Sequence, residues 1–186
     1  MAISIELIKE LRVLTSASVS DCKKALDEAK GDLRLAAEIL KKMGLAIAAK
    51  KAGRAAHNGR IEAYVHLGNK IGAMVEVNCE TDFVARNEEF IRFCKDVSMQ
   101  IAATEPKYLK VEDVPSDIIR TFKDQEKQDY YKVHCLLHQP FIKDPKVSIQ
   151  DCLTSLIAKI GENIVIRRFS RFKLGEAEPA SGQDEK

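Results

Sequence analysis

Residues 61–79, IEAYVHLGNKIGAMVEVNC, decide the fold of this chain. Apolar residues at 61, 63, 65 and 67 alternate with more polar ones, which is typical of a half-buried strand. A second alternation follows the turn Gly68-Asn69-Lys70, so the two segments predict an antiparallel hairpin. The second strand is expected to place five residues on one side: Ile71, Ala73, Val75, Val77 and Cys79.

Helical periodicity follows the hairpin. The first helix should end before Pro106, and its apolar stripe consists of Phe90, Phe93, Val97 and Ile101. Residues 116–137 and 148–160 are also expected to be helical. Residues 163–169, NIVIRRF, are rich in β-forming residues and should add a last strand to the hairpin. Residues 60–174 are therefore predicted to form an α+β core with a small antiparallel sheet.

Upstream of the hairpin, the sequence predicts three short helices. Ser4, Ser18 and Asp32 stand where N-cap residues stand, and Gly44 is expected to end the third helix. Each helix carries an apolar stripe: Leu7, Ile8, Leu11 and Leu14; Cys22, Ala25, Leu26 and Ala29; Leu33, Ala36, Ala37, Leu40 and Met43. Residues 1–46 therefore predict a three-helix domain, whose small core suits it to binding a partner.

The remaining segments connect and end the chain. Residues 47–59 are rich in Ala, Lys and Arg and predict a basic, partly helical connector, whereas residues 175–186 predict a disordered acidic tail. Of the 186 residues, 45% are hydrophobic and 31% are charged, which is typical of a soluble globular protein. No uncharged run approaches the roughly 20 residues of a transmembrane helix, and the N-terminus lacks a secretion signal. We expect a cytoplasmic protein with no membrane partner.

Chemistry-bearing motifs are weak in this sequence. The five cysteines are widely spaced and form no Cys-x-x-Cys pair, so we interpret them as reduced packing residues. His134, Cys135 and His138 lie on one helical turn, but a zinc site needs four ligands and no second pair is nearby. Neither a glycine-rich nucleotide-binding loop nor a nucleophile with a base is recognisable. We therefore expect no metal, no cofactor and no enzymatic activity.

Residues 78–87, NCETDFVARN, place an acid and a large aromatic side by side where the second strand gives way to a helix. Loops held by rigid elements often carry function. Local physics leaves two interpretations open. Thr81 or Asp82 could cap the following helix while Phe83 packs into the core, or Phe83 could be presented to a partner.

Residues 75–87, VEVNCETDFVARN, closely resemble the signature of the translation elongation factor Ts family. Three further segments resemble the same family in the same order, and the resemblance covers most of residues 4–174. These segments are DCKKAL (21–26), AAKKAGR (48–54) and IAKIGENI (157–164). The resemblance implies a ubiquitin-associated-like three-helix domain, then an α+β core, in a protein that binds GDP-bound elongation factor Tu.

The resemblance also implies guanine-nucleotide exchange and assigns the residues for it. Thr81, Asp82, Phe83 and Val84 would intrude beside the partner's nucleotide site and disturb its Mg²⁺ ion, with Phe83 as the wedge and Asp82 as its polar companion. Mg²⁺ demands near-octahedral geometry, so a small displacement of its supporting loop weakens GDP binding. By linkage, bound GDP also weakens the factor's grip on its partner.

A second partner-binding surface is implied near Val19, Ser20 and Lys23. The turn before it, TSASVS (15–20), is smaller and more polar than the usual family pattern, which carries glycines and a pair of methionines. His66, near the hairpin tip, could be structural or could touch the partner.

The hairpin unit YVHLGNKIG (64–72) occurs once in this chain but twice in longer family members, so the resemblance implies a homodimer.

The sequence also allows two other function classes. An RNA-binding protein would use the basic stretches 50–60 and 167–173 with Phe169 and Phe172 as stacking rings, but a net charge of +2 does not favour direct nucleic-acid binding. A binding adaptor would use the three-helix domain alone.

Overall fold

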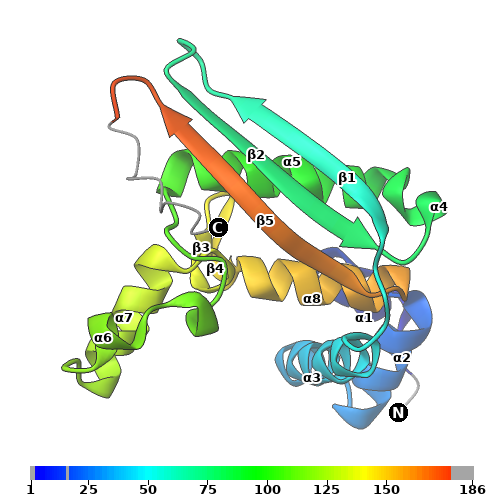
Figure 1. Ribbon diagram of the computed structural model, residues 1–186. Coiled ribbons are helices and arrows are strands. Elements are labelled where there is room, and N and C mark those ends of the chain that lie inside the picture. The colour runs from blue at the N-terminus through cyan, green and yellow to red at the C-terminus, as the bar shows by residue number, and fades with distance from the viewer. Residues whose placement is uncertain (1–2, 16, 177–186) are drawn as a thin grey trace.

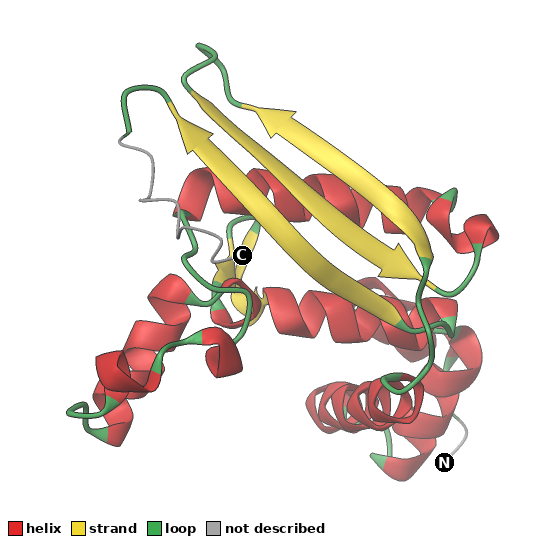
Figure 2. Ribbon diagram, viewed as in Figure 1, coloured by secondary structure: helices red, strands yellow, loops and turns green. Residues whose placement is uncertain are grey.

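A three-stranded antiparallel sheet with helices on one face forms the larger part of the structure (Figures 1 and 2). The computed structural model describes residues 3–15 and 17–176. The sheet has the order β1-β2-β5, with strands β1 (Asn58–Val65), β2 (Ile71–Cys79) and β5 (Ile164–Lys173). Both pairs are antiparallel, so the last strand joins the hairpin as predicted. The fold class is therefore α+β.

The core lies between this sheet and two helices, α5 (Glu88–Thr104) and α8 (Ile149–Ile160). Buried residues of β2 and α5 meet there, and the largest contributors include Val75, Val77, Phe90, Val97 and Ile101. The predicted inward side of the second strand and the apolar stripe of the following helix are therefore confirmed. Helix α5 ends at Thr104, and Glu105 follows in the left-handed conformation just before Pro106.

Three helices precede the sheet: α1 (Ile5–Thr15), α2 (Val19–Glu28) and α3 (Leu33–Lys51). The predicted caps are present, because the backbone N–H groups of Leu7, Asp21 and Leu35 donate to the side chains of Ser4, Ser18 and Asp32 at 3.2, 3.1 and 2.9 Å. These helices enclose a separate cluster of buried residues: Leu11, Cys22, Ala25, Leu26, Ala29 and Ala36. Leu14, predicted in the apolar stripe, is instead 66% exposed, because it lies at the last turn of α1 outside this cluster.

Gly44 does not end the third helix, contrary to the sequence prediction. Helix α3 continues to Lys51, and Gly44 is buried within it. A Cβ built on Gly44 would lie 3.7 Å from both Ala158 Cβ and Thr154 Cγ2 of α8. Gly44 therefore lies in the contact between α3 and α8, where a methyl group would meet α8 at ordinary contact distance, and the first part of the predicted connector is the end of this helix.

Strand β1 presents the opposite face from the one its pattern suggested. Ile61 and Val65 are 62% and 61% exposed, on the side of the sheet away from α5. The reason is the register: Glu62 pairs with Val75 and Tyr64 with Ala73, so these polar residues of β1 share the covered side with the buried residues of β2. The apolar alternation of β1 thus lies on the open face.

Between α5 and α8 the chain forms short elements. They are the 3-10 helices η1 (Val111–Asp113) and η2 (Leu136–His138), helices α6 (Ser116–Ile119) and α7 (Asp124–His134), and strands β3 (Pro140–Phe141) and β4 (Asp144–Ser148). The single helix predicted over 116–137 is therefore broken near residues 120–123. Of the predicted acidic tail, residues 177–186 lie outside the described residues. Among residues 3–15 and 17–176, no helix has the length and apolar character needed to cross a membrane.

Candidate functional site

The site predicted from the sequence lies where β2 leaves the sheet. Residues 80–84, here called the site loop, follow β2 directly and include the first three residues of the four-residue helix α4 (Asp82–Ala85). Thr81 is the N-cap of α4, because its Oγ1 accepts the Val84 backbone N–H at 3.4 Å. The local prediction that Thr81 caps a helix is confirmed.

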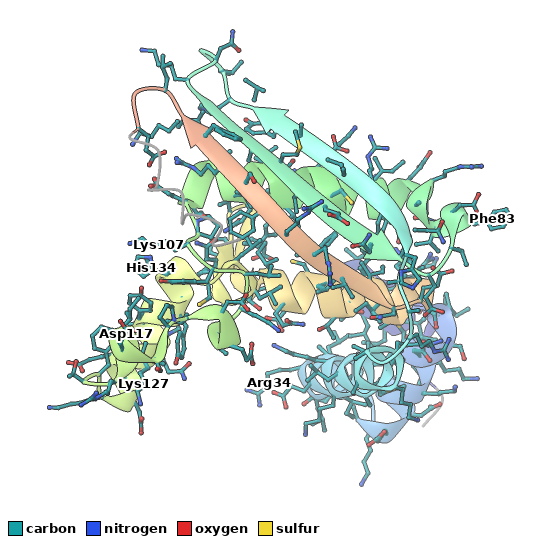
Figure 3. All side chains as sticks on the ribbon, viewed as in Figure 1. Arg34, Phe83, Lys107, Asp117, Lys127 and His134 are labelled. Atoms are coloured by element: carbon teal, nitrogen blue, oxygen red, sulfur yellow. The ribbon has the colours of Figure 1, made fainter. Side chains whose placement is uncertain are left out.

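Phe83 does not pack into the core. It is 80% exposed on α4 and projects away from the body of the molecule (Figure 3). Its neighbour Val84 is partly buried and packs against the core cluster, so α4 is anchored on one side and presents its aromatic ring on the other. The Phe83 ring is therefore open to solvent on a helix whose other side is fixed.

Asp82 is exposed beside Phe83 and forms an ion pair with Arg86, with 3.1 Å between Asp82 Oδ2 and Arg86 Nη2. Both side chains are mostly solvent-accessible, so this pair stabilises α4 only weakly. The Asp82 carboxylate is thus exposed next to Phe83.

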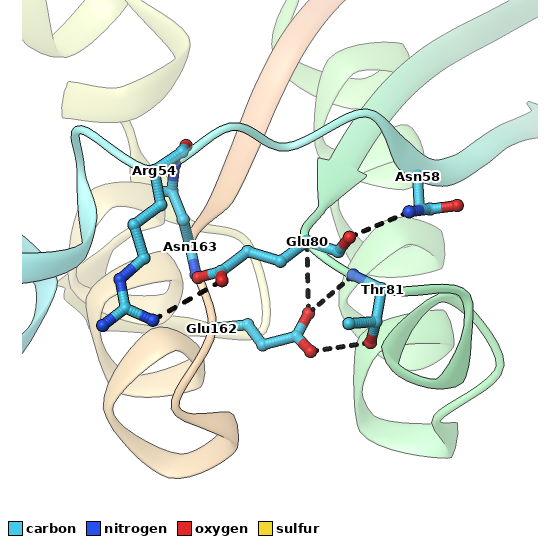
Figure 4. Close-up of polar contacts among 6 residues, drawn as sticks. All are labelled: Arg54, Asn58, Glu80, Thr81, Glu162 and Asn163. Carbon is cyan, nitrogen blue, oxygen red and sulfur yellow. Dashed lines mark hydrogen bonds and ion pairs between the residues drawn. The ribbon is translucent and has the colours of Figure 1, made fainter.

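A carboxylate far away in the sequence holds the site loop (Figure 4). Glu162, between α8 and β5, accepts hydrogen bonds from the backbone N–H groups of Glu80 and Thr81 through Oε2, at 3.1 and 3.0 Å. Its Oε1 accepts the Thr81 hydroxyl at 2.6 Å. Hydrogen bonds to an ionised acceptor are among the stronger ones in proteins.

The Glu80 side chain forms a second connection between the site loop and the α8–β5 turn. Its Oε1 accepts the backbone N–H of Asn163 at 2.6 Å, and its Oε2 lies 3.5 Å from Nη1 of Arg54 (Figure 4). The N–H of Asn163, aided by the Arg54 guanidinium, lowers the pKa of Glu80 below its ordinary value. Asn58 donates from Nδ2 to the Glu80 carbonyl at 2.8 Å. The site loop, the connector and the α8–β5 turn are thus joined in one network.

Cys79 is buried directly before the loop, and its Sγ donates to the Thr81 carbonyl at 3.1 Å. Burial, aided by the negative charge of Glu162, raises the pKa of the Cys79 thiol to about 11. The thiol is therefore protonated at neutral pH and acts as a packing residue, as the sequence analysis expected of the cysteines.

Sequence reasoning missed the residues that hold the loop. Glu162 and Asn163 fall within the segment IAKIGENI, which carried part of the family resemblance, but nothing in the sequence placed them against residues 80 and 81. Asn58 and Arg54 were likewise counted only as parts of the basic connector, residues 47–59, with Arg54 also ending the family segment AAKKAGR. The one available sign in the sequence was that these polar residues stand at the ends of helices and strands. A local pattern does not show which of them meet in the fold.

The secondary site residues lie in two other places. Val19, Ser20 and Lys23 are all exposed at the start of α2, with Val19 54% exposed. In Figure 1, α2 and α4 lie toward the same end of the molecule. His66 follows β1 at the hairpin tip, the opposite end of the sheet from α4, and its Nδ1 lies 3.1 Å from the Tyr64 hydroxyl. The structure thus brings His66 together with Tyr64 and not with Phe83.

The basic stretches of the RNA-binding alternative carry ion pairs. Arg168 pairs with Glu76 at 2.7 Å on the open face of the sheet. Arg171 pairs with Glu105 at 3.3 Å and with Glu176 at 3.7 Å. Partners of opposite charge reduce the positive field that would attract a phosphate backbone.

Comparison with known proteins identifies the family of this chain. A family model described as Elongation factor TS matches residues 6–131. Elongation factor Ts of Carboxydothermus hydrogenoformans is 50% identical over 195 aligned positions, covering 94% of this chain and 90% of the relative. The proteins of the same name from Thermoanaerobacter sp. strain X514 and Anaeromyxobacter sp. strain K are 47% and 48% identical, covering 98% and 94% of this chain and 100% and 89% of the relatives. With the family model over more than half of the chain and close relatives along nearly all of it, the chain belongs to the elongation factor Ts family.

Proposed function

We propose that this protein is a guanine-nucleotide exchange factor that binds GDP-bound elongation factor Tu, disturbs its Mg²⁺ site and promotes GDP release so that GTP can bind. It would support translation elongation in the cytoplasm and act without chemistry of its own. The observation that carries the proposal is Phe83, an 80% exposed aromatic ring on a short helix whose other side is anchored in the core.

Phe83 is the proposed wedge. Burial of a phenylalanine side chain contributes about 1.5–3 kcal/mol, and each 1.4 kcal/mol of coupling changes an affinity about tenfold. If this burial requires the partner's nucleotide-site loop to move, the same free energy opposes the Mg²⁺ geometry on which GDP depends. Thr81 and Val84 hold α4 in place, and Asp82 presents a carboxylate beside the ring. Linkage then requires that GDP and the factor weaken each other's binding.

The three-helix domain, residues 1–46, is the proposed second contact. Val19, Ser20 and Lys23 form a small exposed surface on α2 that would grip the partner while the site loop acts on its nucleotide site. The proposed connector, residues 47–59, joins this domain to the core of residues 60–174. His66, at the far end of the sheet, would reach a different part of the partner.

A second copy of this chain is the proposed occupant of the open sheet face. Apolar side chains from all three strands are exposed there, among them Ile61, Val65, Met74 and Phe172, at 62%, 61%, 49% and 71%. Val65 and Phe172 are the cross-strand neighbours of Gly72 on its two sides. In a two-fold dimer the same patch of both subunits meets, and large exposed apolar patches mark interaction sites.

Sedimentation velocity tests the homodimer. We expect the wild-type chain to sediment as a dimer and Val65→Lys to sediment as a monomer, because each two-fold contact would bury two lysine charges. The matched control is Val133→Lys on α7, where the replaced valine is 57% exposed and lies off the sheet. A monomeric wild type, or an equal effect of both variants, would overturn the dimer.

Nucleotide exchange itself is tested with elongation factor Tu carrying fluorescent GDP and an excess of unlabelled nucleotide. We expect substoichiometric amounts of this protein to accelerate GDP release, since the factor is released when GTP binds. The assay is repeated with RNA competitor, which should leave the rate unchanged because nucleic acid is no part of the proposed complex. A folded protein that leaves GDP release at its spontaneous rate would overturn the proposal.

A further inference from the structure

We propose that Glu162 is a positioning residue for nucleotide exchange: its carboxylate fixes the site loop so that Phe83 is presented in one orientation before the partner binds. The inference rests on the exchange function proposed above and adds to it a residue about 80 positions away in the sequence. Its basis is the juxtaposition of the α8–β5 turn and the start of α4 (Figure 4).

Three hydrogen bonds from two consecutive loop residues converge on this one side chain. The backbone N–H groups of Glu80 and Thr81 donate to Oε2, and the Thr81 hydroxyl donates to Oε1 at 2.6 Å. An ionised carboxylate can accept all of these at once, because it offers two oxygens and no donor. The amide of glutamine offers one oxygen and would turn its NH₂ group toward at least one of the donors.

The Thr81 hydroxyl carries this constraint to the wedge. The hydroxyl donates to Glu162 and accepts the Val84 backbone N–H, so one oxygen joins the carboxylate to the first turn of α4. Phe83 lies between Thr81 and Val84 in the chain and is itself 80% exposed, so its own packing does little to fix it. The orientation of the ring therefore depends on the backbone beneath it.

Glu80 and Asn163 make the connection reciprocal. Each of the two segments supplies a carboxylate that accepts backbone N–H groups of the other, since Glu80 Oε1 accepts from Asn163 at 2.6 Å. Asn163 in turn donates from Nδ2 to the Arg54 carbonyl at 2.7 Å, which ties in the connector that follows α3. A loop fixed in this way loses little conformational entropy on binding, and preorganisation of this kind strengthens productive contacts.

Glu162→Gln is the test variant and Glu89→Gln the matched control. Glu89 also reaches α8, through its ion pair with Lys159, but does not touch residues 80 or 81. Release of fluorescent GDP from elongation factor Tu is measured across factor concentrations, so that the maximal rate is separated from the half-saturating concentration. Hydrogen exchange at the Glu80 and Thr81 amides is followed on the factor alone, and reports the loop independently of any partner.

For Glu162→Gln we expect the maximal rate to fall about tenfold, as loss of hydrogen bonds to a charged group implies, with a smaller change in half-saturation. The Glu80 and Thr81 amides should exchange about tenfold faster.

The outcomes separate this inference from the function it rests on. Wild-type acceleration with an unchanged maximal rate for Glu162→Gln, or with unchanged amide exchange, overturns the positioning role and leaves exchange standing. An equal fall for Glu89→Gln shows general destabilisation and also overturns it. Absence of acceleration by the wild type overturns the exchange function, and this inference with it.

Discussion

Replacing Gly59 by alanine is expected to disrupt the start of β1 beside the site loop. Gly59 has φ +149°, and a Cβ built there would lie 2.2 Å from the Val77 carbonyl oxygen and 2.7 Å from Asn78 Cα. Both atoms belong to the backbone of β2, so no side-chain rotation can relieve the overlap. Gly59 pairs with Asn78, so relief requires the edge strand to move away from β2.

The expected cost follows from two contributions. Overpacking in a closely packed region costs about 1–3 kcal/mol, and a non-glycine residue in a sparsely populated backbone conformation costs about 1–3 kcal/mol. Their sum, about 2–6 kcal/mol, is a large fraction of the 5–15 kcal/mol by which domains of this kind are typically stable. The loss should be partial in practice, because β1 is an edge strand and can shift outward.

Urea unfolding followed by circular dichroism measures the change in the free energy of unfolding. The control is Gly53→Ala, since a Cβ on Gly53 meets nothing within 4 Å, and it should stay within about 0.5 kcal/mol of the wild type. Asn58 is adjacent to Gly59 and donates to the Glu80 carbonyl. Folded Gly59→Ala protein should therefore also accelerate GDP release from elongation factor Tu less than the wild type does. A stability of Gly59→Ala within about 0.5 kcal/mol of the wild type would refute the proximity of β1 to β2.

Three further predictions concern helix packing, pH dependence and thiol reactivity. Gly44→Ala should raise the free energy of unfolding by about 0.5–1 kcal/mol, because Gly44 is inside a helix and the new Cβ would meet α8 at ordinary contact distance. A melting temperature lower than that of the wild type would contradict this prediction. The pKa of Glu80 is lowered by the Asn163 N–H and by Arg54, so its stabilising contribution should be complete above the ordinary value of 4.5 and lost as the pH falls through the lowered value. Urea unfolding of the wild type and Glu80→Gln at several pH values should show a stability difference that shrinks on acidification, and a constant difference would contradict this. Cys79, whose pKa is raised to about 11 by burial, should resist iodoacetamide at pH 8 in the native protein and react after unfolding, and equal rates by mass spectrometry would contradict the burial.

Periodicity predicted the elements whose packing partners are local. The alternation of β2 and the stripe of α5 identified residues that are buried, because a central strand and a covering helix each have one face that must lie in the core. The three N-caps were likewise predictable, since a capping side chain reaches only two or three residues along the chain.

The errors arose where tertiary pairing overrides a local pattern. The apolar residues of β1 lie on the open face because register with β2 fixes which side faces the helices, and Ile61 on that side was taken for core. Gly44 was taken for a helix end, yet α8 packs against it and a helix continues through a buried glycine. Neither fact is encoded within the few residues that a periodicity argument considers.

The site loop, too, was predictable in its local features and not in its tertiary contacts. Residues 81–84 were identified by resemblance, and the structure adds the exposure of Phe83, which local sequence left open. Glu162 could not be predicted as their support, because hydrogen bonds between residues 81 and 162 depend on β5 lying beside β2. Topology thus decides which polar side chains meet at the end of the sheet.

The most direct test of the account is the maximal rate of GDP release from elongation factor Tu at saturating concentrations of the wild type, Phe83→Ala and a distant control, Val133→Ala. Val133 is an exposed apolar residue of α7. We predict that Phe83→Ala lowers the maximal rate about tenfold or more, as the loss of an aromatic ring that the partner would bury implies, and that the variant still binds the partner through α2. Val133→Ala should match the wild type. A Phe83→Ala rate equal to that of the wild type would contradict the wedge, even if nucleotide exchange is retained.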